Sequence, residues 1–189
     1  MLDQVNAPRA VVGGLSMGAA VGLAFALAHP ARVQALVLAA FPPGHSVSGS
    51  VSEAAARFAD AIERDGLEAA GARFVWGPVS GLDPAAGALV RRGFLEHSPH
   101  GLAGTLRGFL AAQASVEELA PRLGTLSQPA LVIVGGHDRL SLAPSRALAA
   151  ALPRARLVVV EGAGHVVNLA RPDAFNVALL EFVGGLDLG

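Results

Sequence analysis

The sequence contains no cysteine, no lysine and no tyrosine, and only 15% of its 189 residues are charged. Without cysteine, the chain can form no disulfide, no thiolate metal site and no cysteine nucleophile. Its 14 basic residues are all arginine, and 15 acidic residues offset them to a formal net charge of −1. This balance gives no electrostatic reason to expect nucleic acid or an anionic membrane as a partner. The lack of cysteine fits a reducing compartment, and we expect a cytoplasmic protein.

Hydrophobic residues are plentiful, at 52% of the chain. A chain of this length and composition buries a substantial core, so disorder is excluded as its main state. No regular repeat period indicates a solenoid. We therefore expect one domain, residues 1–189.

The uncharged segment 10–30 carries three glycines spaced by four residues, a pattern that also occurs in membrane helices. Residues 26–28 (ALA) would in addition fit a signal-peptidase site. A signal peptide needs a basic start, whereas this chain opens with MLDQ and a single Arg9. A strand, a tight glycine turn and a small-residue helix explain the same letters better than a membrane span or a signal peptide.

Short continuous apolar runs predict four buried strands, over residues 10–13, 33–40, 130–134 and 157–160. Helices are expected over residues 17–28, 144–152 and after Pro172. Buried strands separated by helices are typical of an α/β fold with a parallel sheet that helices cover on both faces.

Residues 44–128 differ from the rest because they contain no strong strand signal. Amphipathic helices are expected there over residues 51–64, 67–74, 85–97 and 101–114. A helical insertion between two strands of a parallel sheet is typical of a lid. The alternative is that these helices simply cover a face of the sheet. We expect Phe74 and Trp76 to be core residues, and no metal at His97 and His100.

The segment 14–18 (GLSMG) fits the pattern G-x-S-x-G between a predicted strand and a predicted helix. In this pattern the serine sits on a strained turn, and the flanking glycines leave room for neighbouring backbone. The N–H groups at the start of the helix favour negative charge near Ser16. The alternative is that Ser16 is an ordinary turn serine.

A serine nucleophile needs a base that a third group orients. Asp138 follows the third predicted strand and His165 follows the fourth, where open α/β sheets place their sites. Asp138 could instead be a helix cap or turn residue, and His165 a loop histidine packed under the last helix. We expect His137 to point away from Asp138, because neighbouring side chains in an extended loop diverge.

Three segments together resemble the C-terminal part of an α/β-hydrolase fold protein: VVGGLSMGAAVGLAFALAHPARVQALVLAA, QPALVIVGGHDRLS and LVVVEGAGHVVNLARPDAFNVALLEFV. The order Ser16, Asp138, His165 is also the triad order of that family. The resemblance implies Ser16 as nucleophile, His165 as general base and then acid, and Asp138 as the group that orients the imidazole.

The resemblance further implies that the Met17 backbone N–H is one oxyanion donor. The substrate would be a small ester, lactone or related carbonyl compound, and the reaction would need no metal and no cofactor. The residues that bind the substrate are unknown from the sequence.

In that family, further strands precede the serine turn, and a loop among them supplies a second oxyanion donor. Here only MLDQVNAPR precedes the first predicted strand. At about 30 residues per βαβ unit, roughly 80 to 100 residues of upstream strands are expected to be absent, which is an N-terminally truncated fold. Strand 10–13 would then lie at an exposed sheet edge and favour self-association.

This truncation predicts that the chain by itself is weakly active or inactive. The alternative function is a non-catalytic remnant or a binding module that keeps the fold without a complete oxyanion hole.

Overall fold

The computed structural model describes residues 2–44, 50–77 and 82–187. The chain forms two compact units, one of Met1–Pro42 with Val116–Gly189 and one of Pro43–Ser115. We call them the sheet unit and the helical unit. Residues 116–128, which the sequence places in the insertion, pack with the sheet because Val116, Leu123 and Leu126 are buried in its core.

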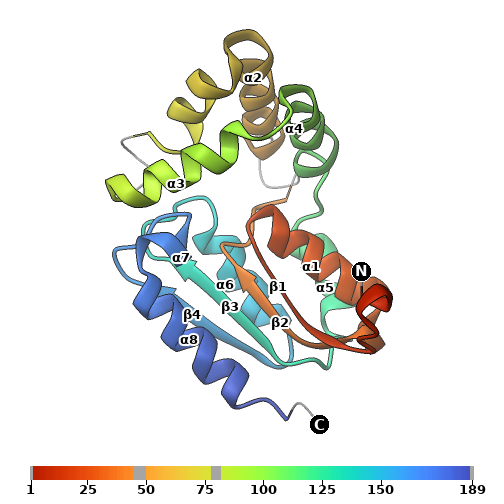
Figure 1. Ribbon diagram of the computed structural model, residues 1–189. Helices are drawn as coiled ribbons and strands as arrows, with labels where there is room; N and C mark the ends of the chain where they lie inside the picture. The colour runs from red at the N-terminus through yellow and green to blue at the C-terminus, as the bar shows by residue number, and fades with distance from the viewer. Residues whose placement is uncertain (1, 45–49, 78–81, 188–189) are drawn as a thin grey trace. The chain divides into compact units, whose positions relative to one another are not determined.

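The sheet unit contains one parallel sheet of four strands in the order β1–β2–β3–β4, as the expected α/β fold requires (Figure 1). The strands are β1 (Ala10–Leu15), β2 (Val33–Ala39), β3 (Ala130–Gly135) and β4 (Ala155–Val160). In register, Gly13 lies opposite Val37, Val37 opposite Leu131, and Leu131 opposite Arg156. All four strands run the same way, so their carboxyl ends share one edge of the sheet.

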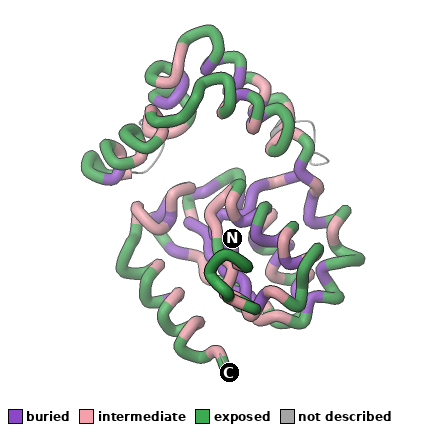
Figure 2. Tube along the Cα trace, turned by 45° about the vertical axis from the view of Figure 1, so that its right-hand side comes forward, coloured by how far each residue is buried: buried purple, intermediate pink, exposed green. Residues whose placement is uncertain are grey.

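Helices cover both faces of this sheet, as expected for continuous apolar strands. They are α1 (Met17–Ala28), α5 (Val116–Leu123), α6 (Leu142–Ala151), α7 (Val167–Ala170) and α8 (Pro172–Gly184), with short 3-10 turns at Asp3–Val5 and Pro30–Arg32. Leu36 and Leu38 pack in a core with α1, α5 and α6, whereas Ala39 and Ile133 pack with α7 and α8. Burial is concentrated along β2 and β3, and much of α8 is exposed (Figure 2).

Helix α1 is built almost entirely from small and apolar residues (MGAAVGLAFALA). Because its residues are apolar nearly all round, the sequence favours a buried helix, but only part of α1 is buried: Val21 is half-exposed while Leu23 and Ala26 are buried. Residues 10–30, which also fit a membrane span by pattern, contain β1 and the short helix α1. Across residues 2–44, 50–77 and 82–187, no helix has both the length and the hydropathy needed to cross a bilayer.

The helical unit contains α2 (Ser50–Phe74), α3 (Pro84–Leu95) and α4 (Pro99–Thr105), which continues into a π-helical turn, Leu106–Leu110. Two expected helices are joined in α2, which kinks at Gly66 with a φ of 82°. Aromatic rings form part of its core, where Phe58 stacks on Phe94 at 5.9 Å and Trp76 meets Phe94 edge-on at 5.4 Å. No strand occurs among the described residues of this unit.

Candidate active site

Ser16 occupies a sharp turn between β1 and α1, with a φ of 55° and a ψ of −117°. A residue other than glycine in such a conformation costs about 1–3 kcal/mol and persists only where its surroundings enforce it. Here the Ser16 N–H donates to the Ala39 carbonyl oxygen of β2 at 2.8 Å, and the Ser16 carbonyl accepts from Ala19 and Ala20. The neighbouring strand and the helix together fix the turn at the carboxyl end of β1.

The two glycines that flank this turn contribute differently. A Cβ at Gly14 would collide with the backbone of Gly18 and Ala19, so only glycine fits there. A Cβ at Gly18 would meet nothing within 4 Å among the described residues. Close backbone approach therefore explains Gly14, but the expectation that Gly18 makes room in the same way is wrong in this structure.

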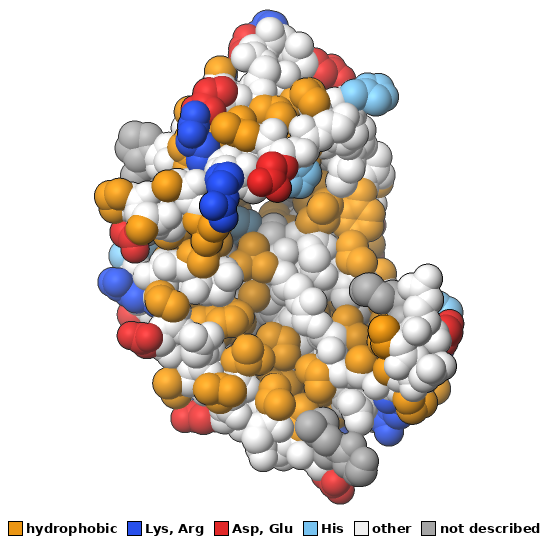
Figure 3. Space-filling view, viewed as in Figure 1, with side chains coloured by type: hydrophobic (Ala, Val, Ile, Leu, Met, Phe, Trp, Pro, Cys, Tyr) orange, Lys and Arg blue, Asp and Glu red, His pale blue; other side chains and the backbone are white. Residues whose placement is uncertain are grey.

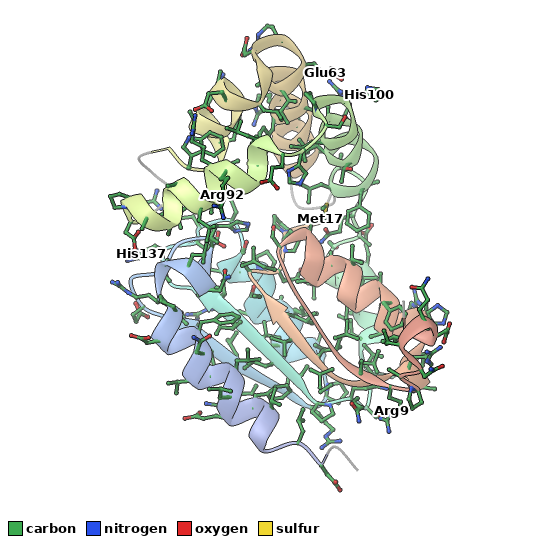
Figure 4. The ribbon with its side chains drawn as sticks, viewed as in Figure 1. Arg9, Met17, Glu63, Arg92, His100 and His137 are labelled. Carbon is green, nitrogen blue, oxygen red and sulfur yellow. The ribbon has the colours of Figure 1, made fainter. Side chains whose placement is uncertain are left out.

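The helix that follows the turn does not use the Ser16 hydroxyl or the Met17 N–H for its own hydrogen bonds. Ser16 is the N-cap residue of α1, yet its hydroxyl makes no capping hydrogen bond. The Met17 N–H belongs to the first helical turn, where N–H groups have no intrahelical acceptor. In Figure 4, Arg9 and Met17 mark the two ends of β1, and Met17 lies at the start of α1. The Ser16 hydroxyl and the Met17 N–H thus lie together at the carboxyl edge.

Asp138 and His165 come from the loops after β3 and β4, and they are in direct contact. The His165 Nδ1 lies 2.7 Å from Asp138 Oδ2. An ionised carboxylate can only accept hydrogen bonds, so Nδ1 carries a proton, and in the neutral ring Nε2 is then the acceptor. The Asp138 side chain is 4% exposed and the His165 side chain 44% exposed, so the carboxylate is sealed off while the ring reaches the surface.

The Asp138 carboxylate is ionised despite its burial. Burial by itself raises the pKa of Asp138, but the hydrogen bond and charge of His165 together with two contacts from Ser141 outweigh it and lower the pKa below its usual value. One of these contacts is the Ser141 N–H, which donates to Asp138 Oδ1 at 3.1 Å. The charge needed to orient an imidazole is therefore present at neutral pH.

The loops that carry these residues are tied together by backbone contacts. The His137 N–H donates to the Ala163 carbonyl at 2.9 Å, which joins the loop after β3 to the loop after β4. A Cβ at Gly135 would collide with the carbonyl oxygens of Ala163 and Gly164, so the two loops can approach only because this residue is glycine. The His137 side chain is exposed while that of Asp138 is buried, as expected for neighbours that diverge.

The structure thus joins two of the predicted site residues and places the third at the same sheet edge. Asp138 and His165 are hydrogen-bonded, whereas no hydrogen bond links Ser16 to His165 among the residues described. The alternative role of Asp138 as a turn residue is also realised, because its Oδ1 accepts a local N–H. Within the described ranges, His97 and His100 belong to no group of three potential metal ligands.

Ser141 was not among the residues predicted for this site. Its side chain is completely buried, and its Oγ lies 3.4 Å from His165 Nδ1. The sequence contains a signal in retrospect, namely a hydroxyl residue three positions after Asp138 in the segment GGHDRLS. A serine just before a helix is usually explained as an N-cap, so its contact with a site residue is easily overlooked.

Comparison with known proteins assigns the chain to a family. The sequence matches the Alpha/beta hydrolase family over residues 1–178. A Bacillus subtilis protein, provisionally named a 2-succinyl-6-hydroxy-2,4-cyclohexadiene-1-carboxylate synthase, is 32% identical over 190 residues, which cover 97% of this chain and 69% of that protein. The pimeloyl-[acyl-carrier protein] methyl ester esterase of Nitrosomonas europaea is 33% identical over 172 residues, which cover 87% of this chain and 67% of that protein.

A solved structure is similar as well. The enol-lactonase from Burkholderia xenovorans LB400 matches with a TM-score of 0.80 and 26% identity, over 97% of this chain and 68% of that one. The chain spans about two thirds of the length of these relatives. The strand order, the helices on both faces and these matches agree, and the chain belongs to the alpha/beta hydrolase family.

Proposed function

We propose that this chain is a serine hydrolase that acts on a small ester, lactone or related carbonyl substrate. The observation that carries the proposal is the 2.7 Å contact between Asp138 and His165 at the sheet edge where β1 ends in the strained Ser16 turn. An imidazole whose Nδ1–H is held by a carboxylate presents Nε2 as a base. In the proposed site Ser16 is the nucleophile, His165 the general base and Asp138 the orienting group.

In the proposed reaction, Ser16 Oγ attacks the substrate carbonyl carbon while its proton passes to His165 Nε2. The oxyanion that forms accepts a hydrogen bond from the Met17 N–H at the positive end of α1. The bond to the leaving group then breaks as His165 protonates the leaving oxygen, and the acyl group stays on Ser16. Water attacks this ester by the same steps and releases the acid and the free serine.

The substrate class is drawn from what the relatives share. The names of the methyl ester esterase and the enol-lactonase both refer to a bond between a carbonyl carbon and an oxygen. The name of the matched synthase refers to no such bond. The common element is a carbonyl substrate rather than one particular compound. We propose that the helical unit, Pro43–Ser115, acts as a lid that selects the substrate, since it is inserted after the carboxyl end of β2.

A second candidate is a non-catalytic binding module that keeps the family fold. The observation that favours it is the missing hydrogen bond between Ser16 and His165 among the described residues. Hydrogen bonds of this kind are often long in the absence of substrate and tighten in the reacting complex. We therefore retain the hydrolase as the leading proposal and the binding module as the alternative.

The polypeptide of residues 1–189, expressed alone, is proposed to be weakly active or inactive. The Met17 N–H, in the first turn of α1, is the backbone oxyanion donor proposed next to the nucleophile. Loss of one of two oxyanion donors typically lowers the rate by about 10²–10³. Turnover of p-nitrophenyl acetate at an ordinary rate, about 10 s⁻¹, by this polypeptide would contradict the proposal.

Self-association through β1 is proposed for the same polypeptide, with a second copy as the partner. In the described part of the chain, β1 pairs with β2 alone and carries no charged residue, whereas the opposite edge strand β4 carries Arg156, which pairs with Glu181 at 2.8 Å. Uncharged edges favour pairing with another chain. Hydrophobic side chains also reach the surface of the sheet unit (Figure 3). Light scattering after size exclusion should show mass rising with concentration, and a constant monomer mass would refute the idea.

A fluorophosphonate probe tests the hydrolase proposal directly, because it reacts only with an activated serine. Labelling is expected at Ser16 and should disappear in Ser16→Ala and in His165→Ala. Ser145→Ala is the control, since Ser145 is a buried serine of the sheet unit whose Oγ accepts the Phe41 N–H at 3.1 Å, away from His165. A folded wild-type chain that shows no labelling supports the binding module instead.

A further inference from the structure

Ser141 resembles Ser16, and differs from Ser98, in the way it precedes a helix. It is the N-cap residue of α6, but its side chain makes no capping hydrogen bond. In the helical unit, Ser98 has the same position before α4, and its hydroxyl does accept the Gly101 N–H at 3.2 Å. A serine hydroxyl at an N-cap ordinarily satisfies an N–H of the first turn. The Ser141 hydroxyl is therefore directed elsewhere.

Its surroundings show where it is directed. Ser141 is 0% exposed, and a buried hydroxyl requires polar partners to offset the cost of leaving water. Its Oγ lies 3.4 Å from His165 Nδ1, beside the shorter contact of 2.7 Å that Asp138 Oδ2 makes with the same nitrogen. Its backbone N–H donates to the other carboxylate oxygen of Asp138 at 3.1 Å. Ser141 thus contacts both residues of the Asp138–His165 pair.

We propose that Ser141 is a positioning residue of this site: its backbone N–H holds the Asp138 carboxylate, and its buried hydroxyl lies against His165 Nδ1 and restrains the ring. This inference rests on the proposed function, in which His165 is the base. Ser141 itself does not touch the substrate, so it acts through the two residues that it contacts.

The His165 ring needs such support because its side chain is 44% exposed and packing alone does not hold it. Rotation of the ring would break its contacts with Asp138 and Ser141 together. Two oxygens beside one nitrogen therefore restrict the ring more than a single carboxylate oxygen does. The Ser141 hydroxyl also lowers the pKa of Asp138, in agreement with a contact to the carboxylate.

The test uses the whole 189-residue chain and compares Ser141→Ala with Ser141→Thr, which keeps the hydroxyl. Ser145→Ala is the matched control, because that buried serine bonds to the Phe41 backbone instead of to the base. For Ser141→Ala, kcat should fall about tenfold, equivalent to about 1.4 kcal/mol, while KM stays within about twofold. Ser141→Thr should restore kcat, and Ser145→Ala should leave it unchanged.

A spectroscopic measurement makes the result independent of turnover. The Nδ1 proton of His165 is followed in ¹⁵N-histidine-labelled protein, and Ser141→Ala should speed its exchange with water, whereas Ser141→Thr and Ser145→Ala should not. Should Ser141→Ala fail to fold, Ser141→Cys keeps the size without a strong hydroxyl and should give the same faster exchange.

Two results would overturn the proposal: unchanged exchange in Ser141→Ala, whether or not kcat falls, or an equal effect of Ser145→Ala. If a folded wild type shows no probe labelling at Ser16, the proposed function fails, whereas weak turnover alone does not contradict it. In that case the exchange rate alone decides whether Ser141 positions the Asp138–His165 pair.

Discussion

Two aspartates, one in each unit, make the same local hydrogen bond in a turn that leads into a helix. Asp83 Oδ1 accepts the N–H of Ala86 at 2.8 Å before α3, and Asp138 Oδ1 accepts the N–H of Ser141 at 3.1 Å before α6. The residues differ in their surroundings, since Asp83 is exposed and Asp138 is only 5% exposed. They also differ in the second oxygen, because that of Asp138 meets His165.

The comparison shows that a turn residue and a site residue can be the same side chain. One carboxylate oxygen orders the local backbone, and this leaves the other oxygen in a fixed position for a partner from a distant loop. Asp83 orders its local backbone in this way, but among the described residues its second oxygen meets no partner from a distant loop. Substitutions at the two positions should separate the local role from the role in the site.

The largest difference is expected in catalysis. Asp138→Asn keeps an oxygen for the Ser141 N–H but can place an amide group against His165 Nδ1, which then loses its acceptor and its tautomer. Ester hydrolysis should fall by about 10³–10⁴, the size of effect that this change produces in serine proteases. Asp83→Asn should leave kcat/KM unchanged. Equal activity of the two variants in a p-nitrophenyl ester assay would break the comparison.

A smaller difference is expected in stability when the whole carboxyl group is removed. Asp138→Ala leaves the buried Ser141 N–H without an acceptor and should cost about 2–3 kcal/mol. Asp83→Ala removes an exposed cap and should cost about 1 kcal/mol. Urea unfolding at pH 7 measures both, and the order of the two midpoints is the decisive quantity. A larger loss for Asp83→Ala would contradict the assignment of Asp138 as the more buried and better-bonded group.

The smallest effect concerns pH. The pKa of Asp138 is lowered in the folded chain. Its carboxylate therefore stabilises the fold in full at any pH above the pKa of an unfolded aspartate, which is about 4. This contribution is lost as the pH falls through the lower, folded pKa. Wild type should therefore lose more stability between about pH 5 and pH 3 than Asp138→Asn does. Parallel acid profiles for the two proteins, measured by urea unfolding, would show that Asp138 contributes nothing to the acid sensitivity.

The fold was predictable because its signals are strong and local. The run ALVIV became a buried parallel strand, as predicted, whereas LVVV became a strand in which only Val160 is buried and Leu157 is exposed. The glycine turn around Ser16 was predictable for a similar reason, since a tight turn between strand and helix needs Gly14. Boundaries were less accurate, as α6 begins at Leu142 although Pro144 had suggested a later start.

Other features depend on contacts between distant segments, which single letters do not reveal. Helix α5 contains Pro121, a residue that usually argues against a helix, and it forms because Val116 and Leu123 are buried against the sheet. Ser141 lies outside the helix expected over residues 144–152, and only the position of His165 shows that its hydroxyl faces the site. The resemblance pairs Asp138 with His165, and the two lie 2.7 Å apart, whereas nothing in the sequence pairs Ser141 with them.

The insertion of the helical unit between β2 and β3 has a consequence for the order of folding. β1, α1 and β2 follow one another closely, so this part of the sheet can form from nearby residues, whereas β2 must find β3 across residues 40–129. Distant parallel pairings form slowly, because the entropy of loop closure is lost before the contacts are gained. We expect the Ser16 turn to form early and the Asp138–His165 pair to form last. A partly folded chain would then possess its proposed nucleophile before it possesses its proposed base.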